Sequence, residues 1–146
     1  MTVSGWTTNG ISKDNILVSN EPEEGLRLYV IDWELARCTR SEVDVGKFVM
    51  MSWSVADRYS SQDCFRLAQE FCKSYQKHYA VDILQVALRS GTELMSWGTI
   101  VKWARDGDEQ TLKAITRTGV DLLEAARERD IDSIRKSVVL RQMYAV

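Results

Sequence analysis

The strongest constraint on the fold is a change of hydrophobic period partway along the chain. Two short apolar, β-branched runs, Asn15–Ser19 and Leu26–Asp32, flank a turn that contains the only proline. From Asp44 onward, apolar residues recur at the spacing of one helix face instead. The sequence therefore predicts a β-hairpin over 15–32, followed by a helical subdomain over 44–146.

Acidic residues and serines mark the expected helix starts, because their side chains accept hydrogen bonds from the free N–H groups of a first helical turn. Asp44 is the expected N-cap of the first helix. We expect one mostly helical α+β domain over 1–146, with four to five helices after the hairpin. The segment 1–14 is expected to be a loop, and 33–43 a loop or one short turn. The further expected helix starts are Ser60 with Asp63, Asp82, about Glu109, and Asp130 or Asp132.

Composition narrows the class of protein. The 146 residues are 45% hydrophobic, which is enough for one core, and the net charge is −2. No block of lysine or arginine stands out, so we expect neither a nucleic-acid partner nor an acidic membrane surface. No apolar run approaches the roughly 20 residues of a membrane helix. Three cysteines without metal-type spacing predict free thiols in a reducing compartment, and thus a cytoplasmic protein.

Two motifs joined by the hairpin carry a family resemblance. The segment Thr8–Asn15 reads TNGISKDN, and Val30–Glu34 reads VIDWE. With Asp44-Val45-Gly46 opening a helix, they resemble the C-terminal lobe of the aminoglycoside phosphotransferase and choline kinase-like family, especially its fungal members. Gly91–Trp97 and Gly119–Glu124 look like the helical tail of that lobe. The resemblance spans almost the whole chain and implies a fold like an isolated kinase-like phosphotransferase C-terminal lobe.

The resemblance implies a metal site at one end of the hairpin. The first motif keeps the frame of the H-x-D-x-x-x-x-N catalytic loop, in which the asparagine and a later aspartate hold the metal ions of the bound nucleotide. Asn15 and Asp32 occupy those two positions. Asn15 begins one strand and Asp32 ends its antiparallel partner, so the hairpin should bring them together. Asp44 would brace the catalytic loop.

The same comparison indicates that phosphoryl transfer is lost. Gly10 stands where the catalytic base is expected, and Thr8 replaces the histidine that steadies the loop. Only Met1–Thr7 precedes the loop, so the nucleotide lobe has no counterpart. We therefore interpret 1–14 as a degenerate catalytic loop. The Mg²⁺ and ATP site is expected to be non-functional, without a working cofactor.

The remaining polar and aromatic residues near the two motifs are the candidates for a site. Asp32, Asp14 and Glu34 are the candidate catalytic carboxylates, because each is close in sequence to the former reaction centre. Asn15, Trp6 and Trp33 are the candidate ligand-binding residues, since aromatic walls with a few polar groups are typical of small-molecule pockets. Core packing and a protein interface are the alternatives for the two tryptophans.

Three functions remain open. The favoured one is a small-molecule-binding protein that catalyses a non-phosphoryl reaction, such as an isomerisation, elimination or cyclisation, in secondary metabolism. The second is a non-catalytic, pseudokinase-like interaction module, in which a homodimer forms through the face that a nucleotide lobe would cover. The third is a remnant or split half of a small-molecule kinase.

Overall fold

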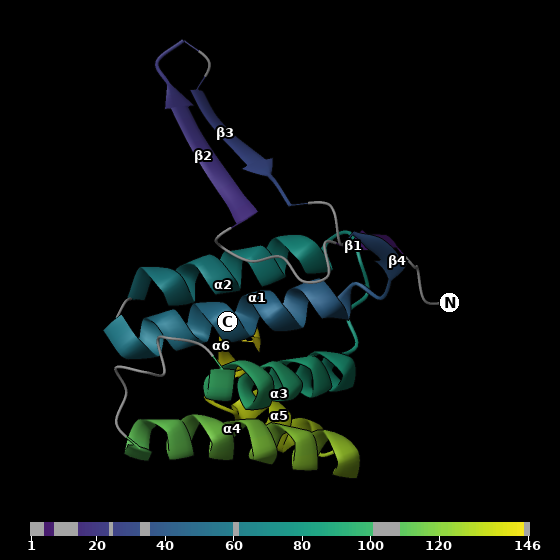
Figure 1. The fold of residues 1–146 in the computed structure, drawn as a ribbon. Coiled ribbons are helices and arrows are strands. Elements are labelled where there is room, and N and C mark those ends of the chain that lie inside the picture. The colour runs from purple at the N-terminus through teal and green to yellow at the C-terminus, as the bar shows by residue number, and fades with distance from the viewer. Residues whose placement is uncertain are drawn as a thin grey trace.

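The computed structural model describes residues 5–7, 15–23, 25–32, 36–59, 62–100 and 109–144. The described part is an α+β fold, mostly α, in which a hairpin precedes the helices, as predicted (Figure 1). The strands are β1 (Gly5–Thr7), β2 (Ile16–Glu21), β3 (Gly25–Val30) and β4 (Arg37–Thr39). The helices are α1 (Glu42–Tyr59), α2 (Gln62–Gln76), α3 (Ile83–Ile100), α4 (Glu109–Glu128), α5 (Ile131–Lys136) and α6 (Arg141–Tyr144).

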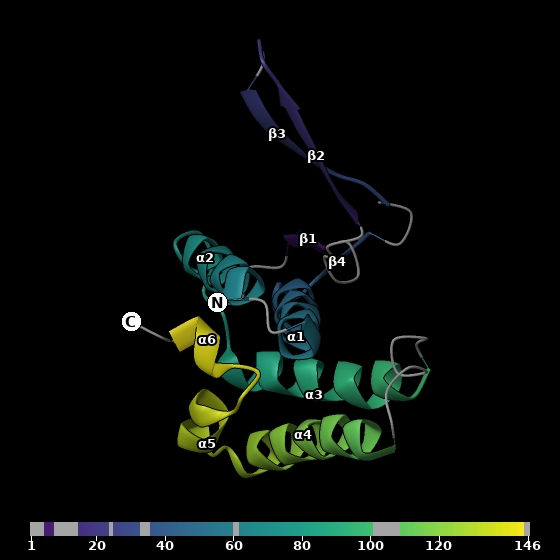
Figure 2. The same ribbon diagram turned by 90° about the vertical axis from the view of Figure 1, so that its left-hand side faces the viewer.

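The predicted hairpin is formed by β2 and β3. The two strands are antiparallel, with Ile16 opposite Val30 at one end and Glu21 opposite Gly25 at the other. Gly25 has a φ of 71°, a left-handed conformation that a glycine adopts without the steric cost of a Cβ. The hairpin projects away from the helices, so most of its side chains are exposed (Figures 1 and 2).

A second pair of strands was not predicted. β1 pairs with β4 in an antiparallel register that places Trp6 opposite Cys38. The expectation of loops at 5–7 and 37–39 is therefore wrong. Each strand is only three residues long, so neither carries an alternating pattern that a sequence can display.

The two strand pairs are nested, and this positions the candidate site. β1 pairs with β4, while β2 and β3, which lie between them in the sequence, pair with each other. The chain therefore passes from one strand pair to the other twice, first from β1 to β2 and then from β3 to β4. The first connection includes 8–14 and the second includes 31–36.

The helices form stacked layers around α3. Figures 1 and 2 show α3 between α1 and α4, with α2 beside α1 and the short α5 and α6 closing one side. α3 and α4 approach closely where two glycines meet: a Cβ at Gly91 would lie 2.9 Å from the carbonyl oxygen of Gly119. The core contains buried apolar side chains from α1 to α6, including Val45, Val49, Met50, Cys72, Val86, Leu94, Leu122, Ile134, Leu140 and Met143.

The helix starts agree only in part with the predictions. Leu84 N–H donates to Asp82 Oδ1 at 2.9 Å, so Asp82 caps α3 as predicted. α1 begins at Glu42, earlier than predicted, and Val45 N–H donates to the carbonyl oxygen of Ser41 at 3.2 Å. The N-cap prediction for Asp44 is therefore wrong, because Ser41 already stands at the start of the helix and Asp44 lies in its first turn.

The chain after α4 forms two short helices, α5 and α6, where the sequence predicted one. Asp130 caps α5 as predicted: its carboxylate accepts hydrogen bonds from the N–H and the hydroxyl of Ser133, at 3.0 Å and 2.6 Å. The hydroxyl and then the backbone of Ser133 hold the pKa of Asp130 below its usual value. The single last helix that we predicted is divided at Ser137, where ψ is 145° and the hydroxyl accepts from Leu140 N–H at 3.1 Å.

Replacing Gly91 with alanine should destabilise the fold. The new methyl group would lie 2.8 Å from Leu123 Cγ and 2.9 Å from the Gly119 carbonyl oxygen. Overpacking of this kind lowers the free energy of unfolding by about 1–3 kcal/mol. Urea denaturation measures the change, and Thr92→Ala is the control at the next, exposed position of α3. Equal stability of G91A and T92A would contradict the close approach.

Replacing Arg129 with glycine should have the opposite effect. Arg129 follows α4 with a φ of 58°, and Asp130 N–H donates to the Ala125 carbonyl oxygen at 2.9 Å, which closes the helix end. Glycine removes the cost of a Cβ in this conformation, so the free energy of unfolding should rise by about 0.5–1 kcal/mol. The matched control is Arg127→Gly inside the exposed last turn, which should lose about 1 kcal/mol. A loss in both variants would show that the helix end is formed differently.

Candidate functional site

The two residues that the resemblance assigns to a metal site lie in contact. Asn15 Nδ2 donates a hydrogen bond to Asp32 Oδ2 at 3.0 Å. Next to it, Ile31 N–H donates to the carbonyl oxygen of Asn15 at 2.9 Å, which extends the ladder of the hairpin by one pair. The hairpin thus brings both side chains to its base, as the antiparallel arrangement predicts. Their roles in binding stay a prediction.

Asp32 has an uncommon backbone conformation. Its φ is 66°, in the left-handed region, and it directly follows the last ladder bond of the hairpin. Aspartate tolerates this region better than most residues, because its short side chain can form local hydrogen bonds. Here the carboxylate is held by Asn15, so the same contact fixes the turn of the chain and the direction of the acid. Backbone strain of this kind is enriched at functional sites.

Most of the other predicted site residues fall in the parts of the chain that the structure does not describe. Gly10, Asp14, Trp33 and Glu34 lie outside the described residues, as does Thr8. Trp6 is described only by its backbone, which pairs with Cys38 in the β1–β4 ladder. Asn15 and Asp32 are the candidate site residues whose side chains the structure describes.

Asp44 is part of a buried polar cluster between α1, α2 and α3. Ser41, Glu42 and Asp44 are all at least nine-tenths buried. Glu42 Oε1 accepts from Asp82 N–H at 3.0 Å, which ties the start of α1 to the start of α3. Burial, and then the charge of Asp44, raise the pKa of Tyr75 on α2, while a hydrogen bond with Ser41 acts in the opposite direction. The brace that we predicted between Asp44 and the 8–14 segment lies outside the described residues.

The Asn15–Asp32 pair suits a magnesium ion only in combination with other ligands. It offers a carboxylate and an amide oxygen, which are hard donors of the type that Mg²⁺ prefers. Within the described ranges, no group of three or more histidine, cysteine, aspartate and glutamate side chains could hold a metal ion. Mg²⁺ commonly binds through one or two protein ligands together with water and phosphate oxygens. By itself the pair is therefore an incomplete magnesium site in the described part of the chain.

Cys72 is a buried thiol and provides no second reactive centre. Cys64 and Cys72 are free thiols, as predicted. Burial raises the pKa of Cys72 to about 12, so its thiolate is scarce near neutral pH. Cys72 therefore contributes to the core.

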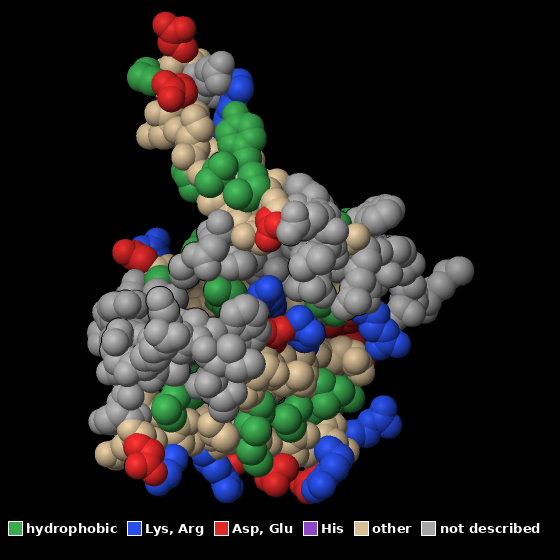
Figure 3. Space-filling model, viewed as in Figure 1, with side chains coloured by type: hydrophobic (Ala, Val, Ile, Leu, Met, Phe, Trp, Pro, Cys, Tyr) green, Lys and Arg blue, Asp and Glu red, His purple; other side chains and the backbone are tan. Residues whose placement is uncertain are grey.

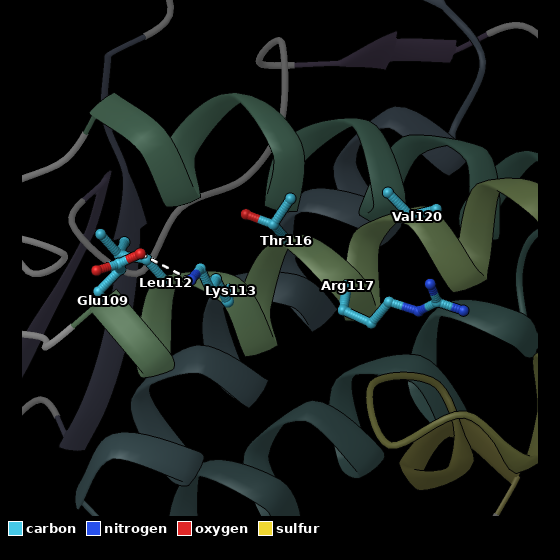
Figure 4. A pocket seen from close by; sticks show the side chains of 6 residues that line it. All are labelled: Glu109, Leu112, Lys113, Thr116, Arg117 and Val120. Carbon is cyan, nitrogen blue, oxygen red and sulfur yellow. Dashed lines mark ion pairs between the residues drawn. The ribbon is translucent and has the colours of Figure 1, made fainter.

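A shallow groove on α4 is a concave feature of the described residues. It has a volume of about 340 Å³ and lies at the end of the molecule opposite the hairpin (Figures 1 and 4). Its charged side chains are paired along the helix, Lys113 with Glu109 at 2.7 Å and Arg117 with Asp121 at 2.8 Å. It thus presents no unpaired acid or base. Its lining residues are Glu109, Leu112, Lys113, Thr116, Arg117 and Val120.

Comparison with known proteins supports a kinase-like relationship at a coarse level. No protein-family model matches the chain. Its sequence is 21% identical over 118 residues to 4-hydroxytryptamine kinase of Psilocybe cyanescens, which covers 80% of this chain and 32% of that kinase. The chain thus spans about a third of the length of the curated relative that it matches. None of the helices in the described ranges has the length and hydrophobicity that a membrane span requires.

Proposed function

We propose that this chain binds a small organic molecule beside the Asn15–Asp32 pair and does not phosphorylate it. The observation that carries the proposal is the hydrogen bond that holds the exposed Asp32 carboxylate in a defined direction. The similarity to 4-hydroxytryptamine kinase supports a ligand-binding role for the chain. Gly10, which has no side chain to accept a proton, supports the loss of phosphoryl transfer.

The chemistry of the pair favours a cationic ligand. An exposed carboxylate forms its strongest hydrogen bonds with charged donors, such as an ammonium group. Asn15 donates to one oxygen of Asp32, which leaves the other oxygen to accept from a ligand. The similar kinase is named for 4-hydroxytryptamine, an aromatic amine. Trp6 and Trp33 would supply aromatic surfaces to such a ligand.

A bound magnesium ion would neutralise phosphate charge at the same pair. Asn15 would present its amide oxygen and Asp32 its carboxylate to the ion. In phosphoryl transfer, a further side chain must accept the proton of the substrate hydroxyl, and Gly10 cannot do so. A reaction that uses only acid and base groups, such as an isomerisation, elimination or cyclisation, would pair Asp32 with Asp14 or Glu34.

Binding of an aromatic amine can be measured directly. Titration with 4-hydroxytryptamine should shift the NMR signals of the Asn15 side-chain amide and of the Ile31 and Asp32 backbone. Asp32→Asn removes the charge and should weaken binding at least about tenfold, since a hydrogen bond to a charged group contributes roughly 1.5–3 kcal/mol. Asp132→Asn is the control, because Asp132 is an exposed aspartate on α5. Equal affinity of both variants would exclude Asp32 from the site.

The absence of phosphoryl transfer needs its own measurement. The chain is incubated with Mg²⁺, ATP and 4-hydroxytryptamine, and the amine is analysed by mass spectrometry. We expect unmodified amine from the wild-type chain and from Asp14→Asn alike. A phosphorylated product would contradict the proposal and indicate that another group has replaced the base.

The exposed hairpin favours a second candidate function, that of an interaction module. The register places Val18 opposite Leu28, with Leu26 farther along the same face. These three side chains are 64%, 64% and 69% exposed. Figure 3 shows apolar side chains along the projecting hairpin. Apolar faces of this kind mark partner sites, and homodimerisation is the simplest arrangement.

Sedimentation velocity tests this second candidate. A chain that dimerises through the hairpin should sediment as a dimer, and Leu28→Lys should return it to a monomer, because a charge is then placed in the apolar contact. Leu67→Lys is the matched control, since Leu67 is 54% exposed on α2 and should not affect association. A wild-type chain that stays monomeric over the whole concentration range would discard the homodimer.

A further inference from the structure

The outer edge of β3 is a second surface of the projecting hairpin, distinct from its apolar face. Within the described residues, β2 and β3 form a sheet of two strands, so each of them is an edge strand. The hairpin stands clear of the helices in both ribbon views (Figures 1 and 2). An edge strand presents backbone N–H and C=O groups with which another strand can pair.

The register of the hairpin shows which backbone groups point to the outer edge of β3. Ile31 N–H donates to the Asn15 carbonyl oxygen at 2.9 Å, so these two residues form a hydrogen-bonded pair. Hydrogen-bonded and non-hydrogen-bonded pairs alternate along an antiparallel ladder. Leu28 and Val18, which lie opposite each other, therefore form a non-hydrogen-bonded pair. The N–H and C=O groups of Leu28 thus point away from β2, and those of Val18 point away from β3.

The sequence of β3 is complementary to a second copy of itself. When two β3 strands run antiparallel with their Leu28 residues opposite each other, Leu26 lies opposite Val30 of the second copy. Arg27 then lies opposite Tyr29 on the other face of the sheet. Apolar side chains therefore meet on one face, and a guanidinium group meets an aromatic ring on the other, where a cation–π contact is favourable. A guanidinium stacks through its flat face, so its N–H groups stay available to other acceptors.

We propose that two copies of this chain join through their β3 edges into one four-stranded antiparallel sheet, with the two-fold axis at Leu28. The two Leu28 residues exchange a pair of backbone hydrogen bonds, because their N–H and C=O groups point outward. A contact of this symmetry closes with two copies. The proposal rests on the second candidate function, the interaction module, and specifies its partner and its mode of pairing.

The edge of β2 fits a second copy less well. The same arrangement centred on Val18 would place Ile16 opposite Asn20 and Leu17 opposite Ser19. Each of these apolar side chains would then face a polar one. Complementarity across the new pair of strands therefore favours the β3 edge.

Amide hydrogen exchange of the wild-type chain, followed by NMR over a range of protein concentrations, tests the pairing. The N–H of Leu28 should be protected at high concentration and should lose this protection on dilution. The N–H of Val18 is the internal control, because it points to the outer edge of β2 and should exchange rapidly at every concentration. Protection of Val18 alone, or of both amides, would overturn the proposal.

Sedimentation velocity of the same samples separates this proposal from the candidate function on which it rests. A dimer in which neither amide is protected would refute pairing through β3 and leave an association through the apolar face of the hairpin. A chain that is monomeric at every concentration would refute both.

Cross-linking of two matched cysteine variants tests the position of the two-fold axis. The Cα atoms of a hydrogen-bonded antiparallel pair lie about 5.5 Å apart, within the range of a disulfide. Leu28→Cys should therefore form a disulfide-linked dimer on mild oxidation, with the bond located at position 28 by peptide mass spectrometry. Val18→Cys is the control: both native side chains are 64% exposed. The two Val18 positions would lie three strand spacings apart, about 14 Å, so this variant should not cross-link. Equal cross-linking of both variants, or none at position 28, would contradict the proposed sheet.

Discussion

The close packing of α3 against both of its neighbours is the constraint on which the helical body depends. Gly46 on α1 lies against Arg89, and Gly91 on α3 meets Gly119 on α4. At each contact a Cβ would come within about 3 Å of another atom, which real structures avoid. The absence of side chains at these three positions therefore sets the separation of the layers. The apolar side chains of the core fill the space that this separation leaves.

The candidate site depends on a different and more local constraint. Asn15 and Asp32 are fixed by the hairpin, since one begins and the other follows its ladder. The nested pairing of β1 with β4 joins the strands that precede and follow the hairpin in the sequence. The pair can thus keep its geometry without any contribution from the α3 glycines. The geometry of the pair and the packing of the helices thus rest on separate contacts.

The elements that were predicted correctly are those marked in the sequence by a repeated hydrophobic period or by turn and capping residues. The α4 stripe of Ile115, Gly119, Leu122 and Ala126 is buried as expected, because a long helix repeats its pattern several times. The hairpin and the caps at Asp82 and Asp130 follow from turn and capping chemistry. β1 and β4 were missed because their pairing joins distant segments too short for a pattern. The start of α1 was misplaced because Ser41 and Asp44 are both suitable caps, and tertiary contacts of Glu42 with Asp82 favour the earlier one.

The candidate site was predictable in its pairing but not in its conformation. Antiparallel strands dictate that Asn15 and Asp32 meet, whereas no sequence pattern indicates the left-handed backbone of Asp32 or the amide direction of Asn15. Both features concern whether the pair needs a ligand in order to form. The amide of Asn15 holds the Asp32 carboxylate in place without a bound cation, so the pair needs no metal to persist. The base of the hairpin alone is therefore a sufficient structural reason for both residues. Binding of an aromatic amine at Asp32, rather than the mere presence of the pair, is what distinguishes a functional site from a structural remnant.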